Sequence, residues 1–319
     1  MAKSLVLAAV VVLGLSLLAA ACSSATTTTT EGVQTTDTTE SLHSVASVSS
    51  TTSTTVAVEV WQTICYEQDT PGLGFTGGWI DSSAAAASKG GFRYVDKTGA
   101  TLTFHFVGSY CGWLAKTADI YGKATVTVDD GSPATVDLYS KDTVWRHVVW
   151  EAKSLPFGDH TVKIQWTGKK RAAGKGTCIN VDAIEIVGAL NGRYQEKNAL
   201  FEYSGTWSTG KSESASGGSF ALTKKPHSSA TVKFTGIQLD WIAKKGPAYG
   251  KAQVIVDSAP PVTVDLYRAA EAWGETAWSS GRLEMGAHTV TIRWTGLKNA
   301  AATGTYINVD AFDISGMVQ

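Results

Sequence analysis

Two matching pairs of an acidic and an aromatic residue are the feature of this sequence best suited to chemistry. The segment Thr-Val-Asp-Leu-Tyr occurs twice and gives the pairs Asp137/Tyr139 and Asp265/Tyr267. In an extended strand, side chains alternate between two faces, so the Asp and Tyr of each pair point outward together, about 7 Å apart. A carboxylate accepts hydrogen bonds from sugar hydroxyl groups and a flat ring stacks on a sugar, so the pairs predict carbohydrate binding. The alternative is a strand-forming Tyr beside a solvated Asp.

Other aromatic and basic residues precede these pairs in the same order both times. A tryptophan begins a loop, and a Tyr-Gly-Lys segment then leads into an apolar strand. We expect these side chains to line one edge of the fold together with the acidic pairs, although a purely structural role for the loop is the alternative. The candidate carbohydrate-binding residues are Trp113, Tyr121, Lys123, Asp137, Tyr139, Trp241, Tyr249, Lys251, Asp265 and Tyr267.

The sequence lacks the common catalytic motifs. It contains no Gly-x-Ser-x-Gly elbow, no His-Glu-x-x-His helix and no phosphate-binding glycine loop. His160 and His288 both lie in Gly-x-His-Thr-Val segments at the start of a strand, where a turn-stabilising role is expected. We therefore expect no catalytic residues and a protein that is not an enzyme.

An internal repeat sets the framework that must position these residues. A shift of 128 positions aligns residues 79–186 with residues 207–314 without a gap, and the repeats span residues 61–188 (repeat 1) and 190–316 (repeat 2). Apolar and polar residues alternate with period two, as in residues 161–166 and 288–294, and Gly and Pro separate these segments. The pattern predicts an all-β protein with two tandem antiparallel sandwiches, joined by a short connection that allows a fixed or a hinged pair.

Three cysteines lie in repeat 1, and repeat 2 has none. We predict a disulfide between Cys111 and Cys178, because repeat 2 places large side chains at both positions, as though the positions touch. A bridge from Cys65 to either of them is the alternative. Because repeat 2 lacks all three, such a bridge is expected to stabilise the fold without taking part in chemistry.

Several longer motifs carry a resemblance to a known family. In repeat 2 these are residues 241–252, the Thr-Val-Asp-Leu-Tyr segment, and Gly304–Phe312, which ends in Ile-Asn-Val-Asp-Ala-Phe. They resemble the galactose-binding-like jelly-roll modules of secreted bacterial proteins, including carbohydrate-binding modules of that fold. The resemblance implies a jelly-roll sandwich in each repeat. Repeat 1 departs from it after Trp113, where Thr-Ala-Asp replaces Lys-Gly-Pro, so the two repeats need not share a ligand.

The same resemblance implies a structural calcium ion between acidic residues of the first and last strands. The corresponding pairs are Glu67 with Asp182 and Glu196 with Asp310. Oxygen ligands suit calcium. The glutamate is displaced by one position between the repeats, because Glu67 aligns with Gln195. We predict no other cofactor.

The first 22 residues predict export. Lys3 is followed by the apolar stretch 5–18 and by three alanines before Cys22, which resembles a bacterial lipoprotein signal in which Cys22 is acylated. An ordinary cleaved signal with a chance cysteine is the alternative. Residues 23–58 are rich in Ser and Thr and predict a disordered linker. We therefore expect an exported protein, lipid-anchored to the outer face of the bacterial cytoplasmic membrane or cell surface.

Charge and composition narrow the partners. The formal net charge is −1, with no cluster of basic residues, which argues against nucleic acid as a partner. The sequence thus favours a lipid-anchored surface protein whose two modules bind cell-wall or extracellular polysaccharide without catalysis. The alternative is a structural or adhesion protein whose modules contact protein partners or act as spacers.

Overall fold

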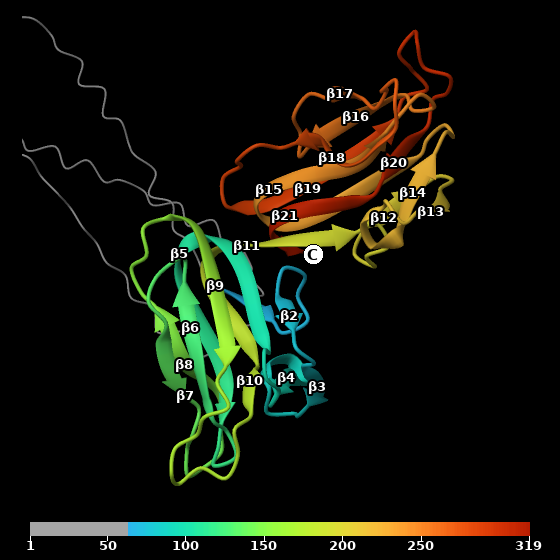
Figure 1. Cartoon of the computed structure of the whole chain (residues 1–319). Coiled ribbons are helices and arrows are strands. Elements are labelled where there is room, and N and C mark those ends of the chain that lie inside the picture. The colour runs from blue at the N-terminus through green and yellow to red at the C-terminus, as the bar shows by residue number, and fades with distance from the viewer. Residues whose placement is uncertain (1–62) are drawn as a thin grey trace, which may run out of the picture.

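A computed structural model describes residues 63–319 and shows an almost entirely β protein with antiparallel sheets (Figure 1). The all-β sandwich prediction is confirmed. The predicted signal, with the lipidation site Cys22, and the predicted linker up to residue 58 lie outside the described residues. Among residues 63–319, no helix has the length and apolar character needed to cross a membrane.

The strands of the two repeats follow the same order. In repeat 1 they are β1 (Thr63–Glu67), β2 (Gly74–Thr76), β3 (Ile80–Ser83), β4 (Gly91–Val95), β5 (Thr101–Thr117), β6 (Lys123–Val128), β7 (Ala134–Asp137), β8 (Val144–Ala152), β9 (Gly158–Trp166), β10 (Ile179–Val181) and β11 (Ala183–Gln195). In repeat 2 they are β12 (Glu202–Ser204), β13 (Ser208–Lys211), β14 (Ser219–Thr223), β15 (Ser229–Lys245), β16 (Lys251–Val256), β17 (Val262–Asp265), β18 (Ala272–Ser279), β19 (Gly286–Trp294), β20 (Ile307–Val309) and β21 (Ala311–Val318). Single 3-10 turns, η1 (Ser88–Gly90) and η2 (Ser216–Gly218), precede β4 and β14.

One strand belongs to the sheets of both repeats. The main sheet runs in the order β17-β16-β19-β15-β21-β11-β5-β9-β6-β7, and two three-stranded sheets, β10-β4-β3 and β13-β14-β20, lie off this path. The first part of β11 pairs with β5 of repeat 1, and its last part, from Asn191 to Gln195, pairs with β21 of repeat 2. The connection between the repeats is therefore a hydrogen-bonded strand.

Alternating side chains on these strands build two cores. In β5, Leu102, Phe104 and Phe106 are fully buried, while His105 between them is exposed. The equivalent residues of β15 bury Val232 and Phe234 in a second cluster. Met317 of β21 packs against the first cluster, so the two cores are in contact through a side chain as well as through the shared strand.

Candidate functional site

Three of the predicted binding residues of repeat 1 do come together, at the free edge of the main sheet. Lys123 of β6 is the register partner of Asp137 in β7. Asp137 Oδ1 accepts the backbone N–H of Tyr139 at 3.1 Å, and Lys123 Nζ lies 3.9 Å from Asp137 Oδ2. Arg171, which the sequence analysis missed, donates through Nε to the same Oδ2 at 3.1 Å. We call Lys123, Asp137, Tyr139 and Arg171 the repeat 1 edge cluster.

Repeat 2 builds the same arrangement with one change. The N–H of Tyr267 donates to Asp265 Oδ1 at 2.9 Å, and Lys251 Nζ lies 3.8 Å from Asp265 Oδ2. Asn299 replaces the arginine and donates through Nδ2 to Asp265 Oδ2 at 3.2 Å. These four residues form the repeat 2 edge cluster.

The change alters access to the aromatic ring. In repeat 1 the guanidinium carbon of Arg171 lies 5.0 Å from the centroid of the Tyr139 ring, so the cation covers one face of it. The shorter Asn299 is held by Asp265 instead. Both tyrosines are half-buried, so each still presents part of its ring to solvent.

The structure places the other predicted aromatic residues in the interior. Trp113 and Trp241 are fully buried, and their indole N–H groups donate to the backbone oxygens of Asn180 and Asn308, each at 3.1 Å. Tyr121 and Tyr249 are only 4% and 6% exposed. Their inclusion among the ligand-stacking residues is wrong, because a ring enclosed by the core has no face left for a sugar.

A lysine covers each of these buried tyrosines. Lys116 Nζ lies 5.8 Å from the Tyr121 ring and 4.5 Å from the ring of half-buried Trp145. In repeat 2, Lys244 Nζ lies 5.7 Å from Tyr249 and 4.4 Å from Trp273. The lysine therefore lies beside the corresponding tyrosine and tryptophan rings in both repeats.

The acidic pair of repeat 1 meets at the 3-10 turn η1. Ser88 Oγ donates to Glu67 Oε1 at 2.9 Å, and the backbone N–H of Ser88 donates to Asp182 Oδ1 at 2.8 Å. The second oxygens, Glu67 Oε2 and Asp182 Oδ2, are buried and have no hydrogen-bond partner within residues 63–319. Burial raises the pKa of Glu67 and raises the pKa of Asp182 to about 6.

Repeat 2 re-creates this pair although its glutamate is one residue out of alignment. Ser219 Oγ donates to Glu196 Oε1 at 2.5 Å, and the N–H of Ser216 donates to Asp310 Oδ1 at 2.9 Å. Glu196 Oε2 and Asp310 Oδ2 are again buried without a partner in the described chain. Burial raises the pKa of Asp310 to about 6.

The carboxylate oxygens of these pairs are suitable ligands for a calcium ion. Each pair offers two buried carboxylate oxygens that lack hydrogen-bond donors, and calcium binds oxygen ligands. In the described part of the chain, no cluster of three or more His, Cys, Asp or Glu side chains is placed to hold a metal. An ion would therefore take its remaining oxygens from hydroxyl, amide or carbonyl groups.

The predicted disulfide is absent. Cys111 and Cys178 are both free thiols. Cys111 is fully buried in β5, where its register partners are Ile186 and Ala152. Cys178 precedes β10 and forms an isolated backbone β-bridge with Tyr121. The two cysteines are therefore not register neighbours. Burial raises the pKa of the Cys111 thiol, which makes it unreactive.

Comparison with known proteins relates the chain to carbohydrate-active enzymes. No family model matches. The chain is 28% identical over 222 residues to an A type blood alpha-D-galactosamine galactosaminidase of Flavonifractor plautii, a match that covers 68% of this chain and 20% of the relative. It is 33% identical over 92 residues to an A type blood N-acetyl-alpha-D-galactosamine deacetylase of the same organism, covering 29% of this chain and 12% of that protein. The chain thus spans about a fifth or less of these relatives.

Two solved structures show weaker likeness. A xanthan lyase of Paenibacillus is 14% identical with a TM-score of 0.31, and the match covers 79% of this chain and 26% of the lyase. An exo-beta-1,3-galactanase of Phanerochaete chrysosporium is 19% identical with a TM-score of 0.28, covering 39% of this chain and 29% of the galactanase.

These relatives bear on two predictions, that the protein is not an enzyme and that its partner is a glycan. The expectation of a non-enzymatic protein with purely binding modules is wrong, because both matched relatives are named as enzymes, a galactosaminidase and a deacetylase. The prediction of a glycan as partner agrees with these carbohydrate-active relatives. Short catalytic motifs do not reveal this relationship, because the similarity is spread over 222 residues.

Proposed function

We propose that this chain works in the enzymatic processing of glycans that contain galactose-type sugars, and that its two edge clusters hold the glycan. The observation that carries the proposal is the similarity, over 68% of the chain, to a protein named as a galactosaminidase. The edge clusters support it, because both repeats place a lysine, a carboxylate and a tyrosine side by side on an accessible sheet edge.

The chemistry of an edge cluster suits a sugar. Lys123 and Arg171 hold the Asp137 carboxylate in place, and a carboxylate accepts hydrogen bonds from hydroxyl groups. The Lys123 amine donates to ring and hydroxyl oxygens. The accessible part of Tyr139 gives an apolar surface for the sugar ring.

The test measures retention and turnover with the full chain. Glycans that end in α-linked galactosamine or N-acetylgalactosamine are offered, and bound glycan, released sugar and released acetate are measured. We expect retention that falls by at least ~100-fold in the Tyr139→Ala/Tyr267→Ala double variant, because the ring contact is lost at both clusters. Tyr110→Ala, a half-buried tyrosine outside both clusters, is the control. Absence of both retention and product, or retention that the double variant leaves unchanged, contradicts the proposal.

We also propose that calcium occupies the two acidic pairs. The unpartnered oxygens of Glu67 and Asp182 in repeat 1 support this, as do those of Glu196 and Asp310 in repeat 2. A bound divalent cation offsets the cost of burying paired carboxylates at the point where each repeat's first and last strands meet. Its role there is structural.

Export and lipid anchoring through Cys22 are a further part of the proposal. The apolar segment and the alanines before Cys22 support it. In a bacterial host, Cys22→Ala is expected to abolish metabolic labelling with palmitate and to release the protein from the membrane fraction. Unchanged fractionation of that variant contradicts the anchor.

A further inference from the structure

A loop rich in cations borders the repeat 1 edge cluster. Residues 167–177 connect β9 to β10 and contain no acidic residue. Their four cations are Lys169, Lys170, Arg171 and Lys175, and all four residues are exposed. We call residues 167–177 the basic loop.

The basic loop packs directly against the edge cluster. The backbone N–H of Lys123 donates to the carbonyl oxygen of Lys169 at 2.8 Å. The guanidinium carbon of Arg171 lies 5.0 Å from the centroid of the Tyr139 ring. A Cβ atom added to Gly174 would lie 3.6 Å from Cδ2 of the same ring, so the loop turns back beside it. A glycan that stacks on Tyr139 therefore lies next to the basic loop.

Carboxylates neutralise only part of this positive charge. Lys175 Nζ lies 2.5 Å from Asp119 Oδ2. Arg171 and Lys123 share the carboxylate of Asp137. These two carboxylates face five cations, the four of the loop and Lys123, so the formal net charge of this edge is +3. An exposed surplus of this kind attracts anions over a Debye length, which is about 10 Å in 0.1 M salt.

Repeat 2 keeps the loop but loses most of its charge. The 128-residue shift aligns the basic loop with residues 295–305, which contain a single cation, Lys298. Together with Lys251 and Asp265 this gives a formal net charge of +1. The exchanged positions are Leu297 for Lys169, Asn299 for Arg171 and Thr303 for Lys175.

The additional cations are not needed to fold the loop. The backbone bond from Lys123 to Lys169 recurs in repeat 2 from Lys251 to Leu297, also at 2.8 Å. In both repeats the indole N–H of the tryptophan before the loop donates to a threonine carbonyl at the end of the loop, at 2.8 Å. Because the same backbone contacts form without the charge, the charge of repeat 1 points to a ligand.

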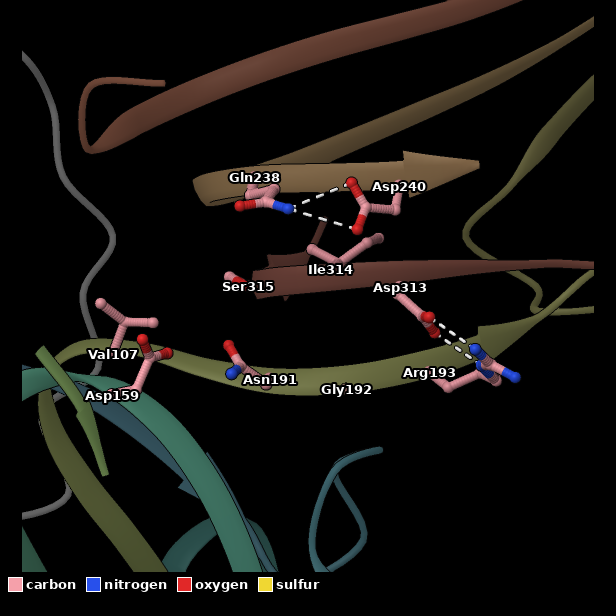
Figure 2. A pocket seen from close by; sticks show the side chains of 10 residues that line it. All are labelled: Val107, Asp159, Asn191, Gly192, Arg193, Gln238, Asp240, Asp313, Ile314 and Ser315. Atoms are coloured by element: carbon pink, nitrogen blue, oxygen red, sulfur yellow. Dashed lines mark hydrogen bonds and ion pairs between the residues drawn. The ribbon is translucent and has the colours of Figure 1, made fainter. Parts of the chain in front are cut away.

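The cavity at the junction of the two repeats has the opposite charge. It measures about 410 Å³, and its lining carries Asp159, Asp240 and Asp313 against Arg193, a formal net charge of −2 (Figure 2). Arg193 donates to both oxygens of Asp313, each at 2.6 Å, so its own charge is matched. An anionic ligand is therefore repelled from the junction and attracted to the basic loop.

We propose that repeat 1 binds glycans that carry anionic groups, a uronic acid carboxylate or a sulfate ester, through its edge cluster and the basic loop together. This inference rests on the proposed function in taking the edge clusters to be glycan sites. It adds the substrate class at repeat 1, namely acidic derivatives of galactose-type sugars. Stacking on neutral sugars is common to both clusters, and the attraction of the negative charge is specific to repeat 1.

The test compares a short oligogalacturonate with its methyl ester, which has the same sugars without the charge. Both are titrated calorimetrically into the full chain carrying Tyr267→Ala, in EDTA and 10 mM salt. We expect about fivefold tighter binding of the acid, the size of an exposed ion pair. In 1 M salt, where the Debye length is about 3 Å, the preference should fall below about twofold.

A second arm distinguishes the two sources of negative charge. A sulfated galactan oligosaccharide is compared with its unsulfated form under the same conditions. The larger of the two preferences identifies the acid group that repeat 1 favours. Equal affinities of the charged and neutral ligands in both arms overturn the inference.

The residues of each repeat supply the variants for the other. Lys169→Leu/Lys175→Thr lowers the charge of repeat 1 to that of repeat 2 and is expected to reduce the preference below about twofold. In a chain carrying Tyr139→Ala, Leu297→Lys/Thr303→Lys is expected to create a preference of about fivefold at repeat 2. All four exchanged residues are exposed, so the fold should tolerate them. A preference that survives the first exchange, or that the second does not create, overturns the inference.

The control removes the same two charges elsewhere. Lys153 and Lys197 are exposed and lie outside both loops and both edge clusters. Lys153 pairs with Glu151 at 2.7 Å, as Lys175 does with Asp119. The preference is expected to persist in Lys197→Leu/Lys153→Thr. If this variant also removes it, the overall charge is responsible and the basic loop is not.

The two proposals fail in different ways. Glycan retention that depends on Tyr139 and Tyr267 but shows no preference for the charged ligand leaves the proposed function standing and overturns the role of the basic loop. A charge preference that depends on Lys169 and Lys175, in a chain whose retention ignores both tyrosines, supports the basic loop and contradicts the role of the edge clusters.

Discussion

A single side chain distinguishes the two edge clusters. Arg171 covers the Tyr139 ring at 5.0 Å and binds Asp137, and Asn299 occupies its place in repeat 2. We predict that Arg171→Asn, in a Tyr267→Ala background, strengthens binding of a short glycan by about two- to fivefold, because the ring loses a competing cation worth about 0.5–1 kcal/mol. Calorimetric titration measures the change.

The exposed Arg293→Asn supplies the matched control, since it removes the same charge outside the clusters. Weaker binding in Arg171→Asn would show that the guanidinium contacts the sugar directly and that its cover of the ring is secondary.

A histidine–aspartate pair stabilises the turn before β9. His160 Nδ1 lies 3.0 Å from Asp129 Oδ2, and Asp129 Oδ1 accepts the N–H of Thr161 at 2.8 Å. Desolvation opposes protonation of His160, but hydrogen bonds to Asp129 and to the Pro156 carbonyl outweigh it and raise the pKa of His160. The hydrogen bond from His160 lowers the pKa of Asp129.

These shifts predict a pH window for stability. A raised histidine pKa stabilises the fold below about pH 6.5, and this contribution is lost as pH rises through the folded-state pKa. A lowered aspartate pKa stabilises above about pH 4 and is lost as pH falls through the folded-state value. Asp129→Asn is therefore expected to lower the melting temperature more at pH 5.5 than at pH 8. An equal loss at both values, measured by calorimetry, contradicts the charged pair.

At the scale of elements, calcium should join the first and last strands of each repeat. The proposed ion contacts the acidic pair that links β1, η1 and the β10–β11 corner in repeat 1. We predict that calcium at 100 times its dissociation constant adds about 2.7 kcal/mol to the free energy of unfolding for one site. Asp182→Asn/Asp310→Asn should abolish the effect, and Asp130→Asn, on an exposed turn, should not. Identical melting curves in calcium and EDTA contradict the site.

The elements also show which features the sequence could reveal. Alternation predicted β9 correctly, since Val162 and Ile164 are fully buried and Lys163 between them is exposed. Trp113 was expected at the start of a loop, whereas β5 continues to Thr117 and residues 111–115 are all buried, so no period-two pattern marks this part of the strand. Alternation distinguishes inside from outside only where one face of a strand meets solvent.

Which distant strands pair with one another is also not visible in the sequence. The proximity of Lys123 to Asp137 followed from neighbouring strands, whereas the contact between Asp313 and Asp240 depends on the register of β21 with β15. Close approach of β5 to β11 requires Gly188, which has φ 140° and whose Cβ would lie 2.0 Å from the Val107 oxygen. Such registers are set by the assembled sheet and leave no local pattern.

The whole molecule separates its edge clusters widely. β7 and β17, which carry Asp137 and Asp265, stand at opposite ends of the strand path, nine strand spacings apart (Figure 1). At about 4.8 Å per spacing this is on the order of 40 Å along the sheet, so a short oligosaccharide reaches one cluster at a time. A polymer can engage both, and its second contact benefits from an effective concentration set by the first.

This separation predicts avidity that depends on ligand length. Tyr139→Ala alone should halve the stoichiometry for a short oligosaccharide while leaving the affinity of the remaining site unchanged. For a long glycan of the same sugars, the same variant should weaken binding about 100-fold, because the bivalent gain of at least that size is lost. Tyr267→Ala should behave alike, which makes each variant the control for the other. The measurement is the rate at which the unaltered chain dissociates from a surface-bound polymer and from a short oligosaccharide. Equal rates for the two ligands would mean that the two edges act independently.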